Sequence, residues 1–352
     1  MTKAESVLLA HEFNPDKHSL AGNFLSDKLD GVRAWWDGGV SRGFPAGDVP
    51  YANTEKDHKR LVPPVATGLW TRTNKVVNAP SWFLDLLPKF PLDGELYCGP
   101  GKWQQTQSIV SRDEPDERWH LVEYKIIDSP CVKRLFQART VKVRNDYSFS
   151  YSGKALAWVL CKGISDKVPS HWSFEFVYKW LSNRFSFDGQ VSLVNQIELP
   201  FSPLEALEKT MEHAKLVVEA GGEGAIVRKR IGLWIPERSW DVLKVKPWFD
   251  AEGVVTGYFS GKKTEKDSTW LGMMGALELN WEGATFKISG FNGSERQLNS
   301  LTRDWAINNP GSRFPDEFES QIFPRGSRVT FKYRELSDDG IPKEARHLRR
   351  AE

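Results

Sequence analysis

The spacing of turn residues is the feature that most constrains the fold of this chain. Most of the sequence reads as short strand-like segments separated by glycine, proline and aspartate, and long helical patterns are few. The clearest helix covers residues 205–220, where Ser202 can cap the start, Pro203 suits the first turn and Gly221-Gly222 ends it. We expect one buried face on this helix, made by Leu207, Met211, Ala214, Leu216 and Val217.

The pattern changes after residue 250, which predicts a second domain. Strands are expected at 253–259, 274–280, 285–289 and 328–336, with a helix at 295–307. A small β-barrel of the OB type has this composition of short strands with one helix. A chain of 352 residues is long enough for two cores, so we predict domains at 1–248 and 249–352.

Composition excludes several classes of protein. Basic and acidic side chains almost balance, at 48 and 46, so the net charge of +2 neither demands nor excludes nucleic acid. Cys98, Cys131 and Cys161 lie far apart, which argues against a zinc site and favours a reducing compartment. We expect no signal peptide and no membrane span, hence an intracellular, cytoplasmic protein, and we expect most of the 15 tryptophans to fill cores.

The segment Lys28-Leu29-Asp30-Gly31-Val32-Arg33 carries the strongest chemical signal. A lysine just before Asp-Gly, with an arginine close behind, suits a lysine that attacks the α-phosphate of a nucleotide. An ordinary lysine has a pKa near 10.4, so desolvation or nearby positive charge has to lower the pKa for rapid attack. Taken alone, the segment also fits a surface turn.

Four further segments extend this signal. Residues 92–96 place Glu95 after a tight Asp-Gly turn, and residues 223–229 place Glu223 at the opening of a strand. Lys244 and Lys246 alternate, so both ammonium groups point to one face of a strand. The Thr-Arg-Thr-Asn segment at 71–74 offers Arg72 beside turn formers. Each segment has an ordinary structural explanation by itself.

In this order and spacing, the segments resemble the motif series of the ATP-dependent DNA ligases, within the covalent nucleotidyltransferase superfamily. The resemblance covers nearly the whole chain and includes the glycine turn at 271–275 and the Asp-Gly-Ile-Pro segment after residue 336. It implies an α+β nucleotidyltransferase (adenylation) domain of antiparallel sheets with flanking helices, followed by an OB-fold DNA-binding domain. The length suggests the small bacteriophage-type ligases.

The resemblance also implies roles for individual residues. Lys28 would be the adenylated nucleophile, and Lys244 and Lys246 would neutralise the triphosphate and help to lower the pKa of Lys28. Glu95 and Glu223 would bind ribose hydroxyls or Mg²⁺. The remaining contacts to ATP or the nick would come from Arg33, Arg72 and Tyr124, with Tyr124 stacking on adenine, and Arg139 falls near another family arginine.

Some positions depart from the family pattern. Many relatives carry glutamate two places before the nucleophile to read the adenine amine, whereas this chain has Ser26. The second motif appears with Asn74 where relatives have glycine, which a left-handed turn tolerates, and Ser41-Arg42-Gly43 competes with it. The basic tail at 346–350 is a remnant of the last motif, so its role stays open.

The implied reaction has three phosphoryl transfers: Lys28 takes AMP from ATP, AMP passes to a 5′-phosphate at a nick in duplex DNA, and the 3′-hydroxyl displaces AMP. An RNA ligase, an mRNA guanylyltransferase and a catalytically silent DNA-binding module are the alternatives. We expect a monomer, with a role in DNA replication, repair or recombination and a hinge near Pro247. Candidate phosphate contacts in the second domain are Lys262, Lys263, Lys266, Arg325, Arg328, Lys332 and Arg334.

Overall fold

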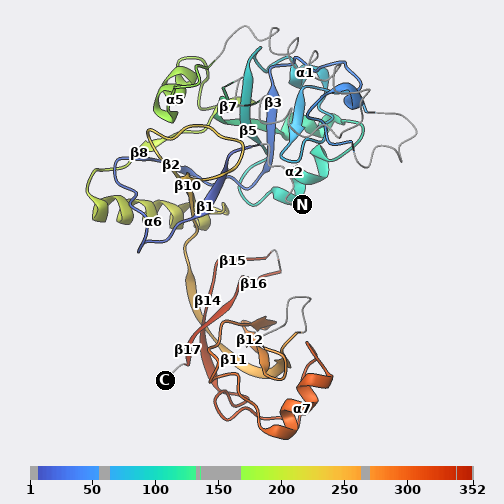
Figure 1. Cartoon of the computed structure of the whole chain (residues 1–352), viewed down its shortest axis with the longest axis vertical. Coiled ribbons are helices and arrows are strands. Elements are labelled where there is room, and N and C mark those ends of the chain that lie inside the picture. The colour runs from blue at the N-terminus through green and yellow to red at the C-terminus, as the bar shows by residue number, and fades with distance from the viewer. Residues whose placement is uncertain are drawn as a thin grey trace, which may run out of the picture. The chain divides into compact units, whose positions relative to one another are not determined.

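The computed structural model describes residues 7–54, 64–131, 135, 168–262, 270–337 and 339–350. The chain divides into two compact units, Met1–Lys246 and Pro247–Glu352, so the division falls two residues before the predicted one. Figure 1 shows the elements of each unit.

The first unit contains two five-stranded sheets. The first sheet has the order β1 (Leu9–Glu12), β10 (Arg238–Val245), β9 (Ala225–Arg228), β2 (Phe24–Asp27), β8 (Ile197–Glu198). The second sheet has the order β4 (Leu69–Thr71), β3 (Val32–Asp37), β5 (Pro91–Tyr97), β6 (Glu123–Asp128), β7 (Val191–Leu193). Pairing is antiparallel as predicted except at β1–β10 and β6–β7, which run parallel, so both sheets are mixed.

Few helices accompany these sheets. They are α1 (Ser81–Leu84), α2 (Trp103–Val110), α5 (Phe174–Ser182) and α6 (Pro203–Glu219), with short 3₁₀ turns at Ala46–Asp48 and Glu117–Leu121. Helix α1 is short and begins immediately after Pro80. Helix α6 begins as predicted, with Ser202 accepting a hydrogen bond from the Glu205 N–H.

The buried face of α6 differs from the predicted one. Ala206, Thr210 and Ala214 are buried, whereas Met211 and Leu216 are exposed. The buried positions are four residues apart and carry small side chains, which lets the helix lie close to the first sheet. The apolar residues under α6 include Leu25, Val227 and Leu243, so one face of this sheet belongs to the helix.

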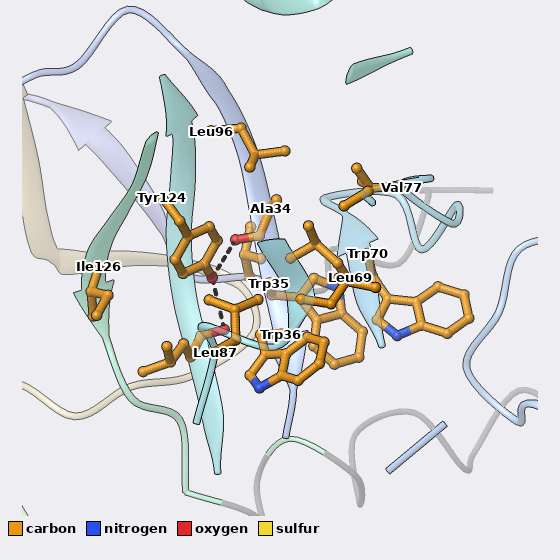
Figure 2. Packing of buried hydrophobic residues seen from close by; sticks show 14 of the residues in the cluster. Ala34, Trp35, Trp36, Leu69, Trp70, Val77, Leu87, Leu96, Tyr124 and Ile126 are labelled. Atoms are coloured by element: carbon orange, nitrogen blue, oxygen red, sulfur yellow. Dashed lines mark hydrogen bonds between the residues drawn. The ribbon is translucent and has the colours of Figure 1, made fainter. Parts of the chain in front are cut away.

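The core of the second sheet is rich in aromatic side chains. Trp35, Trp36 and Trp70 pack with Leu69 and Leu96, and Figure 2 shows this cluster around β3 and β4. Trp35 and Trp70 stack with ring centroids 6.1 Å apart. These tryptophans fill the core as predicted, and they fix the position of β3, which begins four residues after Lys28.

The described part of the second unit contains an open five-stranded sheet, a two-stranded sheet and one helix. Its strand order is β13 (Ala284–Ile288), β12 (Met274–Trp281), β11 (Phe249–Ser260), β14 (Arg328–Tyr333), β17 (Arg346–Arg350), beside the pair β15 (Glu335–Leu336) and β16 (Pro342–Lys343), and the helix is α7 (Ser300–Asn308). The described strands do not form the closed barrel that we expected. An isolated β-bridge between Ser289 and Arg346 joins the two edge strands of this sheet, just beyond the end of β13. There the His347 N–H donates to the Ser289 carbonyl at 2.7 Å.

Candidate active site

A cavity of about 900 Å³ lies in the first unit, lined by residues of both sheets. Strand alternation determines which side chains reach it. On β2, Leu25 packs under α6 while Ser26 lines the cavity, and Lys28 follows two residues later on the cavity side. On β10, Leu243 packs under the helix and Lys244 lines the cavity. One face of the first sheet therefore packs in the core under α6, and the opposite face lines the cavity.

Lys28 meets Glu223 in this cavity. The Lys28 N–H donates to the Gly224 carbonyl at 2.8 Å, and the Glu223 N–H donates to the Lys28 carbonyl at 3.4 Å. This backbone pairing brings residues 195 positions apart into register, and the Lys28 ammonium donates to the Glu223 carboxylate. Glu223 also accepts from Lys246 Nζ at 3.1 Å. The structure thus joins three of the predicted site residues in one cluster.

Glu223 stays ionised between these two lysines. Burial would raise the pKa of its carboxyl, but the charges and hydrogen bonds of Lys28 and Lys246 outweigh burial and hold the pKa below its usual value. Gly224 is required beside it, because its φ is +125° and a Cβ atom there would lie 2.4 Å from the Val245 carbonyl oxygen. The Glu-Gly pair therefore places a carboxylate where a larger second residue would not fit.

Glu95 approaches the same site from β5. Its Oε1 accepts a hydrogen bond from the Gly31 N–H at 3.0 Å, so the Asp-Gly turn after Lys28 is tied directly to this carboxyl group. Burial raises the pKa of Glu95 to about 7, although Arg33 and Lys28 oppose the shift. A Cβ atom on Gly31 would lie 2.4 Å from the Leu96 carbonyl oxygen, which explains the glycine of the motif.

Arg33 lines the cavity but is held by a buried carboxylate. Its Nε donates to Asp93 Oδ1 at 2.8 Å and its terminal nitrogen donates to Asp93 Oδ2 at 3.0 Å. Trp234 Nε1 donates to the same Asp93 Oδ2 at 2.7 Å. The aspartate of the 92–96 segment therefore fixes Arg33, which leaves fewer of its N–H groups for a nucleotide than the sequence suggested.

The turn after β4 carries Arg72 to the cavity wall. Asn74 adopts φ +63°, the left-handed conformation that the sequence predicted for it. The competing Arg42 instead pairs with Asp85 at its Nη1, and its neighbour Ser41 is buried against Asp37. Since neither Ser41 nor Arg42 lines the cavity, Arg72 is the better match to the second motif.

Tyr124 does not line the cavity, which corrects the prediction that it stacks on a base. Its ring is fully buried, and its hydroxyl lies 3.2 Å from the Ala34 carbonyl oxygen (Figure 2) and 3.3 Å from that of Leu92, as a donor to both. Side chains of β6 alternate, so Tyr124 and Ile126 enter the core while Ile127 lines the cavity. The sequence analysis favoured the aromatic residue and missed Ile127, although the alternation of side chains along this strand pointed to it.

Comparisons with known proteins agree with this geometry. A family model described as DNA ligase OB-like domain matches residues 268–350. The chain is 23% identical to a DNA ligase of Haemophilus influenzae over 97% of its own length and 91% of that protein. A solved structure from a study of Lig E DNA ligases is 25% identical, covers 98% of both chains and has a TM-score of 0.57.

This chain is similar to DNA ligases over nearly its whole length. The enzyme class that the motifs indicated is thereby confirmed. A further structure, named Pmar-Lig_Pre, shares the fold at 15% identity and a TM-score of 0.56, over 98% of this chain and 67% of the other. The adenylation and OB architecture predicted from the motifs is confirmed, apart from the open second sheet.

The ligase has two carboxylates that could hold a metal ion. Glu95 and Glu223 face the same space, and their charges interact. The described residues contain no cluster of three or more histidine, cysteine or acidic side chains, so they do not form a complete metal cage. Magnesium commonly uses one or two carboxylates together with substrate phosphates, and the pair fits that arrangement.

Several of the predicted phosphate contacts belong to the second unit. In the second unit, Arg334 and Lys332 stack on Trp248 at 3.7 and 4.8 Å, while Arg325 pairs with Asp316 at 3.2 Å. Arg328 lies 3.5 Å from Glu252. Arg139, Lys263, Lys266 and Cys161, which the sequence analysis also named, lie outside the described residues. No helix in the described part of the chain is long and apolar enough to cross a membrane.

Proposed function

We propose that this protein is an ATP-dependent DNA ligase that seals nicks with a 5′-phosphate and a 3′-hydroxyl in duplex DNA. The observation that carries the proposal is the pairing of Lys28 with Glu223 in a nucleotide-sized cavity, where Lys246 also contacts Glu223. A chain that merely bound DNA would not need a lysine paired with a carboxylate in such a cavity. The relatives named as DNA ligases support the polynucleotide substrate.

In the first step, the Lys28 amine attacks the α-phosphate of ATP, forms a phosphoramide bond and releases pyrophosphate. The Lys28 ammonium has to leave Glu223 and lose a proton to solvent before this attack, because an ammonium has no free electron pair. Lys246, which also contacts Glu223, keeps that carboxylate neutralised when Lys28 leaves it. Lys244 lies on the cavity wall and would neutralise the negative charge that builds up on the leaving pyrophosphate.

The next two steps use the adenylated lysine. The 5′-phosphate of the nick attacks the lysyl phosphorus and takes AMP, which regenerates the Lys28 amine. The 3′-hydroxyl then attacks this activated phosphate and releases AMP. Glu95 and Glu223 would hold Mg²⁺, which would offset the negative charge of the phosphates. Arg72 would add a planar donor for phosphate or ribose oxygens.

The base of ATP would lie against the apolar part of the cavity. Ile127 comes from the second sheet and Ile226 from the first, and both line the cavity with Phe174 and Val194. A purine base is flat and largely apolar on its faces, so such walls suit it. We therefore assign to Ile127 the contact with the base that was predicted for Tyr124.

Sealing of a labelled, singly nicked duplex with ATP and Mg²⁺ tests the proposal, with Lys28→Ala beside the unmodified protein. We expect a longer strand from the unmodified protein and none from the variant, which should still bind DNA. Covalent label from ATP without DNA sealing would indicate an RNA ligase, and label from GTP an mRNA guanylyltransferase. If neither label nor sealing occurs, the chain is a silent binding module and the proposal is wrong.

A further inference from the structure

Ser26 has an unusual neighbour on the cavity side of the first sheet. Strands β2 and β8 pair antiparallel with Phe24 opposite Glu198 and Leu25 opposite Ile197. Gln196 immediately precedes β8, so extending this register by one step pairs it with Ser26. Opposite residues of an antiparallel pair share a face, and both Ser26 and Gln196 line the cavity. A short side chain on one strand is thus matched by a long polar one on its neighbour.

The side-chain oxygen of Gln196 has an unused acceptor capacity. Its Oε1 is buried, and within the described part of the chain it accepts no hydrogen bond. Its backbone is fixed, because the Gln196 N–H donates to the Tyr178 hydroxyl at 3.1 Å. A buried amide oxygen without a donor typically costs about 1–3 kcal/mol, so a ligand that supplies a donor gains from meeting it.

The surroundings of this oxygen define the ligand that it would meet. Val194 precedes Gln196 by two residues, and Ile226 stands opposite Ser26 on β9, so apolar walls flank the acceptor. Lys28 follows Ser26 by two residues, which places the nucleophile on the same side of the sheet. A planar base with a donor at its edge, attached to a phosphate that reaches Lys28, fits this arrangement.

We propose that Gln196 reads the exocyclic amine of adenine, in place of a longer side chain at position 26. The inference rests on the proposed function, since it assigns the base contact of the ATP that adenylates Lys28. The adenine amine donates to Gln196 Oε1, whereas guanine presents an acceptor at the corresponding position and leaves the buried oxygen unpaired. Gln196 is therefore a specificity-determining residue that reaches across from the neighbouring strand.

The test compares ATP with purine riboside triphosphate, which is the same nucleotide without the exocyclic amine. For the unmodified protein, we expect kcat/KM for covalent labelling of Lys28 to fall about tenfold when the amine is missing, as for loss of one neutral hydrogen bond. Gln196→Leu should label more slowly with ATP and show no difference between the two nucleotides. Gln196→Glu keeps an acceptor and should keep the preference for ATP.

The matched control is Asn195→Leu, because Asn195 is exposed, adjacent in sequence and not part of the cavity wall. This variant should keep the full preference for ATP. Equal use of both nucleotides by the unmodified protein, or a preserved preference in Gln196→Leu, would overturn the inference. Failure of the proposed function looks different, because no nucleotide would then label Lys28 in the unmodified protein.

Discussion

Glu95 gives the active site a pH dependence that can be measured through stability. Its pKa is raised by burial from 4.5 to about 7, so the folded protein holds a proton on this carboxyl group that the unfolded chain has lost. Between these two values the folded state binds more protons than the unfolded state. The contribution of Glu95 to the free energy of unfolding is therefore greatest at low pH and decreases as pH rises towards 7.

We expect this contribution to decrease by up to about 1.4 kcal/mol per pH unit within that window. Glu95→Gln should remove it, since glutamine does not titrate. The measurement is denaturant unfolding of the unmodified protein and Glu95→Gln at several pH values between 5 and 8. The difference between their unfolding free energies is plotted against pH. A difference that does not change with pH would contradict the raised pKa.

Tyr124 and Ile127 make a matched pair for testing which face of β6 meets the nucleotide. Tyr124→Phe removes a hydroxyl that donates to two carbonyls in the core, so we expect about 1 kcal/mol lower stability and an unchanged KM for ATP. Ile127→Ala removes an apolar contact from the cavity wall, and we expect the KM for ATP to rise about tenfold. Adenylation kinetics and thermal unfolding of each variant check both halves, and an unchanged KM for ATP in Ile127→Ala would contradict the assignment of this face of β6 to the nucleotide.

At the residue scale, the sequence identified Lys28, Glu95, Glu223 and Lys244 as residues that share one site, because a nucleophile and its counter-charges have few chemical alternatives. It did not identify Gln196, which is one glutamine among many polar residues until the β2–β8 register places it opposite Ser26. It also misplaced Tyr124, because an aromatic side chain suits a core and a base-binding wall equally well.

At the scale of elements, one buried ion pair ties the two sheets together. Arg228 at the end of β9 pairs with Asp128 at the end of β6, and both side chains are almost completely buried. The guanidinium also lies 4.2 Å from the Phe174 ring. Burial raises the pKa of Asp128, but Arg228 opposes this shift, so loss of the arginine would leave a buried carboxyl without its countercharge.

We expect Arg228→Met to lower the free energy of unfolding by about 3–5 kcal/mol. The control is Lys229→Met, which breaks the exposed pair with Asp241 and should cost less than about 1 kcal/mol. The double variant Arg228→Met with Asp128→Leu should recover part of the loss, since it removes the stranded carboxyl group. Denaturant unfolding of the unmodified protein, Arg228→Met, Asp128→Leu and the double variant provides the cycle, and equal costs for Arg228→Met and the control Lys229→Met would refute the sheet-linking role.

Elements were predictable from the sequence where local signals agreed. Helix α6 has a cap, a first-turn proline and a terminal glycine, and its start at Pro203 follows from them. Its buried face did not follow, because Ala206, Thr210 and Ala214 are small, and hydrophobicity favoured the larger Met211 and Leu216, which lie exposed. Close approach to the sheet, rather than hydrophobicity, selected the contact face. The parallel edges at β1 and β7 depend on long-range pairing that local patterns do not contain.

At the scale of the whole molecule, the second unit supplies the surface on which DNA binding can be tested. Trp248 is surrounded by Arg334, Lys332 and Arg346, with the last at 5.6 Å from the ring. Within the described chain, no acidic side chain pairs with Lys332 or Arg346. Arg328 also belongs to this unit, but it lies beside Glu252, which already offsets its charge. Charges around Trp248 are therefore better placed to neutralise phosphates.

We expect the double variant Lys332→Gln with Arg346→Gln to weaken binding to a nicked duplex and to reduce the slope of log K against log salt by about 2. Each phosphate contact releases roughly one counterion, so the slope counts the contacts that are lost. Arg328→Gln serves as the control and should leave the slope almost unchanged. Fluorescence anisotropy across a series of salt concentrations measures these slopes, and covalent labelling of Lys28 by ATP without DNA should stay unchanged in both proteins. An unchanged slope in the double variant would remove this cluster from the DNA-binding surface, whereas a loss of labelling would show that the substitutions disturb more than DNA contact.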